Sequence, residues 1–138
     1  MESSWLQMLC TLAIRKKKIA LVACVKEKSS SPCEVGKMYL SKDFQNWLTF
    51  ARDWGADLIF VLSGQHGLLN LTDVIEPYDF NLNDQLSSYR VAWSDNVIRS
   101  LSMHCDLKED EFLLLSNKIY AEFLIPHFGK VEMPLVIH

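Results

Sequence analysis

The sequence predicts an α/β protein, a three-layer αβα sandwich around a mostly parallel central sheet. Two apolar runs of strand length, residues 19–25 and 57–63, are typical of strands buried on both faces. Between them, apolar residues recur at helical spacing from Phe44 to Trp54. A strand, a helix and a strand in this order favour a right-handed crossover between parallel neighbours. The 138 residues, 49% hydrophobic and 22% charged, are enough for one domain with a substantial core.

Four further elements complete the predicted sheet and its helical layers. Residues 82–101 have apolar side chains at helical spacing, residues 112–115 form a third buried strand, and a helix from Asn117 ends near Pro126. The first helix is expected to begin after its N-cap Ser41 and to end at Gly55. We expect residues 133–137 to form the last strand. The apolar face of the long helix is expected to comprise Leu82, Leu86, Tyr89, Trp93, Val97 and Leu101.

The start of the chain and the cysteines limit the class of protein. Residues 1–17 are expected to form an N-terminal extension and residues 18–138 a single α/β domain. The apolar part of the extension precedes its positive charges and is shorter than the roughly 20 residues of a membrane span, so we expect a cytoplasmic protein without a membrane segment. The 4 cysteines are scattered, without the close pairs of a structural zinc site. No metal, disulfide framework or cofactor is expected.

The charge distribution limits how the chain can bind nucleic acid. A formal net charge of -3 disfavours a general nucleic-acid coat, because neutralising phosphates requires a surplus of Lys and Arg on at least one face. A local basic face is left open, since residues 15–18 read Arg-Lys-Lys-Lys and both Lys26 and Lys28 follow the first strand. The alternative is that these charges are solvated side chains flanking a buried strand.

Polar and ionisable residues gather where the predicted strands end. In open α/β sheets, ligands bind beyond the carboxyl ends of the strands. These positions therefore predict a site, although polar residues also follow strands in ordinary loops. The candidates are Cys24, Lys26 and Lys28 after the first strand, Ser63, Gly64, His66 and Gly67 after the second, and Asn117 after the third.

The connection over residues 62–82 is long and chemically varied. Connections between elements are usually only about 4–6 residues long, and longer ones often build a site or are disordered. Gly64 and Gly67 would let backbone N–H groups approach an anion or a base, or they simply make a turn. We expect this segment to form a site wall, with Tyr78 and Asp79 folding back over the end of the second strand.

Four side chains near the predicted site have both a functional and a structural interpretation. His66 has an ordinary pKa near neutrality and suits acid–base catalysis, whereas a loop histidine is more often a hydrogen-bonded structural residue. Asp79 would orient a water or bind a sugar hydroxyl, or it makes a turn or caps the next helix. Tyr39 and Tyr78 would stack on a base, or they pack at the edge of the core.

The order of the motifs resembles two families. Residues 62–82 resemble the central motif of the YaaA peroxide-stress proteins, in which a strand ends in LSGxYG and a Pro-Tyr precedes the next helix. The likeness is closer to the DUF6884 family, with its pattern CSxxK, YxSxxF, SAKYGL, PYD and AGxxY. The matching pieces here are residues 23–28, 39–44, 63–68, 77–79 and 116–120. This chain departs from the pattern at Val25, His66, Ser116 and Asn117.

The resemblance implies a nucleobase held at the strand ends. YaaA proteins are associated with DNA binding and protection from oxidative stress. The CSxxK pattern also resembles the core of archaeosine synthases, which act on a deazaguanine base in tRNA, and the wider group is similar to the uracil-DNA-glycosylase type of α/β fold. The partner implied is a nucleic acid, a nucleotide or a nucleobase. The matching motifs contribute Cys24, Tyr39, Ser41, Tyr78 and Tyr120 to the expected site.

We expect a nucleobase- or nucleic-acid-handling protein, and first a glycosidase or base-exchange enzyme. Asp79 would orient a water or stabilise positive charge on the sugar, and His66 or Lys28 would assist the leaving base. The alternative is a non-catalytic DNA- or nucleotide-binding module in stress or phage-related regulation, and a small-molecule sensor or assembly subunit is a third possibility. The sequence does not predict an oligomeric state. The expected binding residues are Cys24, Lys26, Tyr39, Ser41, Ser63, Gly64, Gly67, Tyr78, Asn117 and Tyr120.

Overall fold

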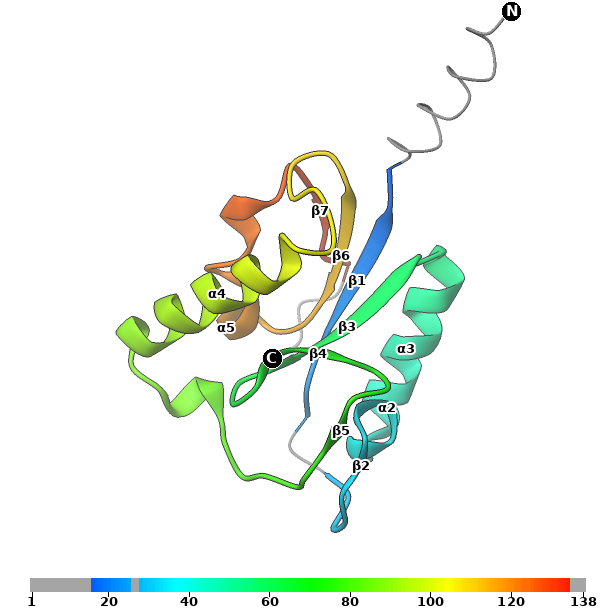
Figure 1. Cartoon of the computed structure of the whole chain (residues 1–138), viewed down its shortest axis with the longest axis vertical. Coiled ribbons are helices and arrows are strands. Elements are labelled where there is room, and N and C mark those ends of the chain that lie inside the picture. Colours follow the sequence, from blue (N-terminus) through cyan, green and yellow to red (C-terminus); the bar gives the residue numbers. More distant parts are fainter. Residues whose placement is uncertain (1–15, 26–27, 135–138) are drawn as a thin grey trace, which may run out of the picture.

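The computed structural model describes residues 16–25 and 28–134, and its centre is a five-stranded sheet (Figure 1). The strand order is β4-β3-β1-β6-β7, with β4 antiparallel to β3 and the other neighbouring pairs parallel. The predicted mostly parallel sheet is therefore confirmed. The strands are β1 (Lys18–Ala23), β3 (Leu58–Ser63), β4 (Gly67–Asn70), β6 (Glu111–Leu115) and β7 (Lys130–Glu132).

Strand β1 lies at the centre of the sheet and is almost entirely buried. Its Val22 pairs with Val61 of β3 on one side and with Leu115 of β6 on the other. Residues 19–22 have no exposed surface, as expected for a parallel strand covered on both faces. The three buried strands predicted from apolar runs are confirmed to within two residues at each end.

Helices cover both faces of the sheet, which confirms the three-layer arrangement (Figure 1). Helix α3 (Lys42–Trp54) lies on one side, and α4 (Ser87–Leu101) and α5 (Lys118–Ala121) lie on the other. The predicted ends of α3 are correct. The Ser41 hydroxyl accepts a hydrogen bond from the Asp43 N–H at 3.1 Å, and Gly55 ends the helix with a φ of 94°, a conformation that favours glycine.

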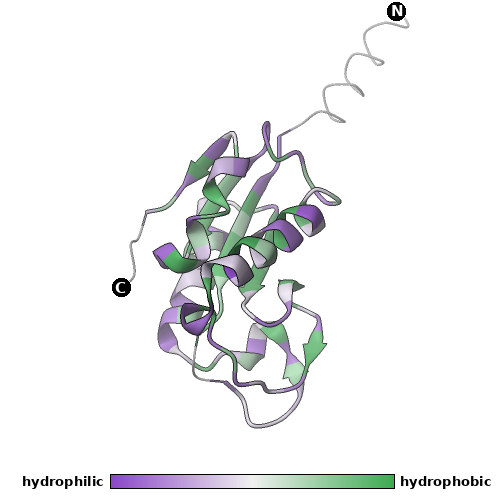
Figure 2. Ribbon diagram, turned by 90° about the vertical axis from the view of Figure 1, so that its left-hand side faces the viewer, coloured by the Kyte–Doolittle hydropathy of each residue, from purple (hydrophilic) through white to green (hydrophobic). Residues whose placement is uncertain are grey.

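The core consists of the two sheet faces and the apolar sides of α3 and α4. Figure 2 shows the hydrophobic strands enclosed between helices whose outer sides are hydrophilic. Burying a large aliphatic or aromatic side chain contributes about 1.5–3 kcal/mol, so these contacts dominate the stability of the domain. The buried helix residues are Phe44, Trp47, Leu48 and Ala51 of α3, and Trp93, Val97 and Leu101 of α4.

The start of the long second helix differs from the prediction. Helix α4 begins at Ser87, and residues 82–84 form a separate 3-10 turn, η1 (Leu82–Asp84). The side chains of Leu86 and Tyr89, predicted to face the sheet, are 77% and 39% exposed. The cause is Asn81, whose Oδ1 accepts from the N–H of Asn83 at 2.9 Å and thereby fixes a separate turn before α4.

The end of the chain differs from the prediction at Met133 and Pro134. Among the described residues the last strand is β7, which pairs with β6, and Met133 and Pro134 lie beyond it without strand structure. Residues 135–138, part of the strand predicted at 133–137, lie outside the described residues. The prediction followed an apolar run, whereas this edge strand exposes Lys130 and Glu132. The helix predicted from Asn117 is the short α5, followed by the 3-10 turn η2 (Ile125–His127), which contains Pro126.

Four short elements were not predicted. Strand β4 makes a hairpin with β3, and a two-stranded sheet joins β2 (Cys33–Glu34) to β5 (Val74–Ile75). Helix α2 (Val35–Met38) follows β2 directly. The connections that follow the first two predicted strands, residues 26–37 and 62–82, therefore contain three short strands and the start of a helix.

The expected N-terminal extension lies mostly outside the described residues. Lys17, at its predicted end, is tied to the domain: its backbone N–H donates to Asp110 at 2.8 Å, and its carbonyl accepts from the N–H of Glu111 at 2.9 Å. The division at residue 17 and the cytoplasmic location both stay predictions. In the part of the chain that is described, no helix has the length and apolar character needed to cross a membrane.

Candidate functional site

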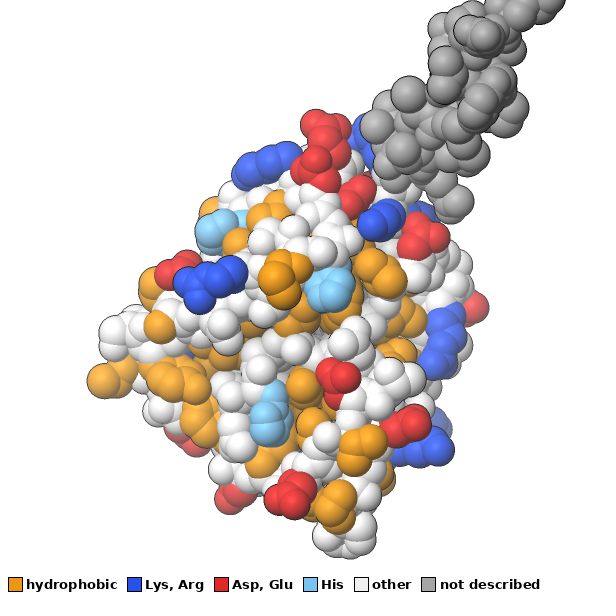
Figure 3. Space-filling view, in the orientation of Figure 1, with side chains coloured by type: hydrophobic (Ala, Val, Ile, Leu, Met, Phe, Trp, Pro, Cys, Tyr) orange, Lys and Arg blue, Asp and Glu red, His pale blue; other side chains and the backbone are white. Residues whose placement is uncertain are grey.

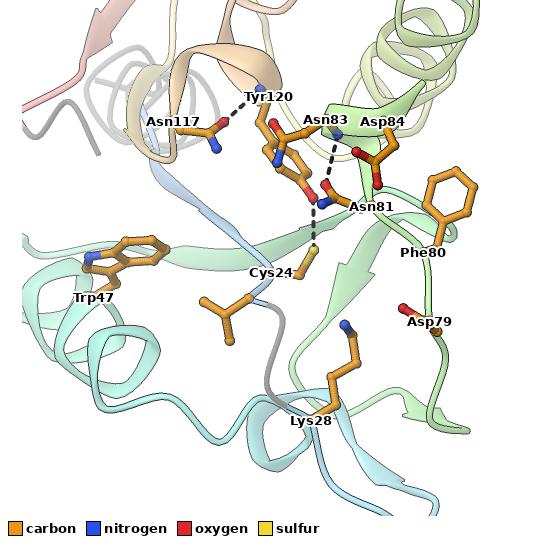
Figure 4. A pocket seen from close by; sticks show the side chains of 11 residues that line it. Cys24, Lys28, Trp47, Asp79, Phe80, Asn81, Asn83, Asp84, Asn117 and Tyr120 are labelled. Atoms are coloured by element: carbon orange, nitrogen blue, oxygen red, sulfur yellow. Dashed lines mark hydrogen bonds between the residues drawn. The ribbon is translucent and has the colours of Figure 1, made fainter. Parts of the chain in front are cut away.

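A pocket of about 580 Å³ opens beyond the carboxyl ends of β1 and β6 (Figure 4). Cys24 and Val25 follow β1 directly, Asn117 follows β6, and residues 79–84 form the opposite wall. This is the position that the strand-end rule predicts. The lining residues are Cys24, Val25, Lys28, Trp47, Asp79, Phe80, Asn81, Asn83, Asp84, Asn117 and Tyr120.

Cys24 and Tyr120 are joined in the pocket wall. The Cys24 sulfur lies 3.2 Å from the Tyr120 hydroxyl, and Figure 4 shows both side chains facing the same space. Tyr120 also packs edge-on against Trp93 of α4, with ring centroids 5.5 Å apart. The two contacts fix the phenol between the sheet and α4, so this side of the pocket is held in place by side chains of the domain itself.

Tyr78 anchors the opposite wall to the sheet. Its hydroxyl is hydrogen-bonded to that of Tyr39 at 2.6 Å and to that of Ser63 at 2.8 Å, and the Ser63 hydroxyl also accepts from the His66 N–H at 3.0 Å. Tyr39 and Ser63 have no exposed surface. The prediction that Tyr78 folds back over the end of the second strand is confirmed. Because Asp79 is the next residue, this anchor determines where its backbone lies.

Gly64 makes the return of this segment possible. A methyl group at its Cα would lie 3.2 Å from Cβ of Leu82 and from Cδ1 of Phe80, which is tighter than ordinary carbon contacts. The absence of a side chain therefore lets residues 80–82 lie across the end of β3. Gly67, at the start of β4, has a φ of 76°, a backbone conformation that favours glycine.

Lys28 and His66 both contact the ring of Tyr78, one through its charge and the other through its ring. The Lys28 ammonium lies 4.6 Å from the centre of the Tyr78 ring and 5.9 Å from that of Tyr39, within the range of cation–π attraction. The His66 ring packs edge-on against Tyr78, with centroids 4.9 Å apart. Lys28 lines the pocket, whereas the exposed His66 does not.

The buried tyrosines keep their protons. Burial raises the pKa of Tyr39, Tyr78 and Tyr120 well above the ordinary value, and the nearby Cys24 raises it further. A phenol with such a pKa acts as a hydrogen-bonding group and not as an anion at neutral pH. These hydroxyls therefore support the pocket, while its negative charge comes from carboxylates.

The pocket presents carboxylates, amides and one ammonium group. Asp79 and Asp84 lie on one wall together with Asn81 and Asn83, and Lys28 lies below them in Figure 4. Carboxylates accept hydrogen bonds from hydroxyl and N–H groups, and amides both donate and accept. Two aromatic rings, Trp47 and Phe80, stand on opposite sides in Figure 4. The lining thus suits a polar ligand with an aromatic ring. Among the described residues, no three His, Cys, Asp or Glu side chains are grouped to hold a metal ion.

The residues predicted for the site fall into four groups. Ser41 caps α3, and Lys26 lies outside the described residues. The pocket lining holds Cys24, Lys28, Asp79, Asn117 and Tyr120. Behind the lining lie Tyr39, Ser63 and Tyr78, and the turn and its flanks contain Gly64, His66 and Gly67.

Several lining residues were missed from the sequence. Trp47 lies within the apolar pattern that predicted the first helix and was not considered for the site; it is only 9% exposed, yet it reaches the pocket. Residues 80 and 81 were assigned to the connection and residues 82–84 to the start of the long helix, so their side chains were not considered for the site. The run Asn-Leu-Asn-Asp at residues 81–84 carried a usable signal, since Asn and Asp are typical of capped turns whose side chains point outward.

Comparisons with known proteins give one match. The model of a family of unknown function (DUF6884) matches residues 19–137. No curated protein matches the chain, and no solved structure does.

Proposed function

We propose that this chain, which belongs to the DUF6884 family of unknown function, binds a nucleobase or nucleoside in the pocket and cleaves or exchanges its N-glycosidic bond. The observation that carries the proposal is the pocket itself: Asp79, Lys28 and Asn117 converge on one space at the strand ends. The sequence motifs resemble those of YaaA proteins and archaeosine synthases, and this resemblance supports the same class of ligand.

The chemistry of the pocket fits cleavage of a bond between a sugar and a base. In hydrolysis the bond from C1′ to the base nitrogen breaks, positive charge develops on the sugar, and a water oxygen adds to C1′. A carboxylate stabilises that charge and accepts the proton of the water, and we assign this role to Asp79. The base leaves with the bonding electrons and takes up a proton. Lys28 assists by donating a hydrogen bond to the leaving base.

The assignments differ from the sequence-based hypothesis at His66. Its ring lies outside the lining and packs on Tyr78, so Lys28 is the better candidate to assist the leaving base. Tyr39 and Tyr78 support the wall, because their hydroxyls are bonded to each other and Tyr39 is fully buried. The aromatic rings of the pocket lining are those of Trp47, Phe80 and Tyr120, and aromatic faces stack on any nucleobase.

The test is release of a free base. Purified protein is incubated with ribonucleosides, tRNA, DNA and DNA with modified bases, and small products are identified by mass spectrometry. Asp79→Asn keeps the size of the side chain and removes its charge. We expect it to slow release by about 100-fold, the lower end of what a positioned general base contributes. Lys28→Met is expected to slow it as well.

A matched control is available on α4. Asp95 is exposed and does not line the pocket, so Asp95→Asn makes the same chemical change elsewhere and is expected to retain full release. Equal rates for the Asp79→Asn and wild-type proteins would remove Asp79 from the mechanism. Absence of release from every substrate would reject the enzyme and favour the binding module.

The binding-module alternative needs one continuous basic surface. Lys17 precedes β1 and Lys18 begins it, and their ammonium groups donate to the carbonyls of His104 and Trp54. Lys28 follows β1, which is 6 residues long, about 20 Å at the rise of a strand. On the face shown in Figure 3, Lys and Arg side chains are interspersed with carboxylates. This alternative predicts affinity for DNA that falls steeply with salt, and a salt-independent affinity would count against it.

A further inference from the structure

Two asparagines of the pocket have a fixed orientation. The Oδ1 of Asn117 accepts from the backbone N–H of Tyr120 at 3.3 Å, and the Oδ1 of Asn81 accepts from the N–H of Asn83 at 2.9 Å. A backbone N–H only donates, so the atom that faces it must be the amide oxygen. Turning either amide over would lose this bond and place two donors against each other.

The fixed orientation leaves the amino end of each amide for a ligand. Both residues line the pocket, and Figure 4 shows them on either side of the Tyr120 side chain. Within residues 16–25 and 28–134, neither Nδ2 is used in a hydrogen bond. Asn117 comes from the end of β6 and Asn81 from the opposite wall. The pocket therefore offers two pure donors from two directions.

We infer that Asn81 and Asn117 are specificity-determining donors, and that the pocket prefers a base with a ring carbonyl over its amino counterpart. A carbonyl oxygen accepts from an amide N–H, whereas an exocyclic amino group would set donor against donor. The preferred class is the oxo bases, such as uracil and hypoxanthine, over cytosine and adenine. This inference rests on the proposed function, because it assumes that the occupant is a base.

The expected size of the preference follows from the hydrogen bonds. A site built to donate to a ligand rejects an analogue that cannot accept, because the bound analogue displaces water from the donor and leaves it unpaired. One lost bond of ordinary strength corresponds to about a tenfold loss of affinity. We therefore expect inosine to bind at least about tenfold more tightly than adenosine, and uridine at least about tenfold more tightly than cytidine.

Asparagine-to-aspartate variants separate specificity from structure. In Asn81→Asp and Asn117→Asp, one carboxylate oxygen keeps the bond to the capped N–H, while the donor is replaced by an acceptor. Both variants are expected to keep the fold of the wild type. Because the nucleosides are uncharged, the added charge has little direct effect on their affinity. Asn46→Asp, on the exposed surface of α3 and outside the pocket, is the matched control.

The experiment is calorimetric titration of each protein with inosine, adenosine, uridine and cytidine, together with a melting curve. We expect the wild type and Asn46→Asp to bind the oxo nucleoside of each pair more tightly than the amino nucleoside. Both pocket variants are expected to lose about tenfold of their affinity for the oxo nucleoside while keeping the wild-type melting temperature. Equal affinities within the pairs, or a preference that survives both variants, would overturn the inference and leave the proposed function standing. Failure of all four nucleosides to bind the wild type would overturn both.

Discussion

Removing one atom, the hydroxyl oxygen of Tyr78, is expected to detach the pocket wall formed by residues 79–84 from the sheet. Tyr78→Phe leaves the ring in place, including its contacts with Lys28 and His66. It removes the hydrogen bonds to Tyr39 at 2.6 Å and to Ser63 at 2.8 Å. The backbone that leads into Asp79 then loses its connection to the end of β3.

The cost of this change follows from the two lost bonds. Each ordinary hydrogen bond contributes about 1 kcal/mol, and a buried partner left unsatisfied adds about 1–3 kcal/mol. Tyr39 and Ser63 are both fully buried, but the Ser63 hydroxyl still accepts from the His66 N–H. We therefore expect the free energy of unfolding to fall by about 2–4 kcal/mol. For a domain of this size, that lowers the melting temperature by roughly 10 °C.

Urea unfolding followed by tryptophan fluorescence measures this loss. The control is Tyr89→Phe, which removes a hydroxyl that donates to the Gly64 carbonyl at 3.3 Å from a ring that is 39% exposed. We expect that variant to lose about 0.5 kcal/mol, because water replaces the partner. One hydrogen bond contributes about 1 kcal/mol, so a free energy of unfolding of Tyr78→Phe within about 0.5 kcal/mol of the wild-type value would refute the reasoning. Equal losses in the two variants would refute it as well.

Two further predictions concern positions outside the pocket. Burial raises the pKa of the Cys105 thiol to about 11. As the pH rises, the unfolded chain therefore releases this proton before the folded protein does, and stability falls from about pH 9 upward. Cys105→Ser keeps a donor for the Leu101 carbonyl and should flatten the dependence of the melting temperature on pH over that range, whereas an unchanged slope would exclude Cys105 as the cause. Gly129→Ala would drive a methyl group into the Lys108 carbonyl and should lower the free energy of unfolding in urea by about 3 kcal/mol. The control is Gly36→Ala in helix α2, whose nearest contact is at 3.5 Å; it should leave that free energy unchanged or raise it by up to about 1 kcal/mol, and similar losses in the two variants would contradict the overlap.

The buried elements were predictable because their signals are long and strong. Strand β1 follows from an uninterrupted apolar run, and α3 follows from apolar spacing between Ser41 and Gly55, both of which cap it as expected. The order of the elements then placed Cys24 and Asn117 at the same edge of the sheet. Both residues line the pocket, so the location of the candidate site was available from topology.

The shorter elements and the start of α4 were not predictable from the spacing of apolar residues. Strands β2 and β5 have only 2 residues each, too few to show an alternation of polar and apolar side chains. The start of α4 was misplaced because apolar spacing continues through Leu86, which is nevertheless 77% exposed. Its exposure follows from the turn that Asn81 fixes upstream, a contact between neighbouring residues that spacing does not reveal.

The length of the connection at residues 62–82 has a physical reason in the fold. After β3, the chain turns back through β4 and pairs β5 with β2 before Tyr78 returns to Ser63 at the end of β3. A direct connection from β3 to α4 would join the same two elements but would not form this wall of the pocket. The detour brings Asp79 and Asn81 to face Asn117 across the pocket, and Gly64 provides the space in which the returning chain lies. The residues that make this stretch unusual as sequence are therefore those that let one segment begin at a strand end and come back to it.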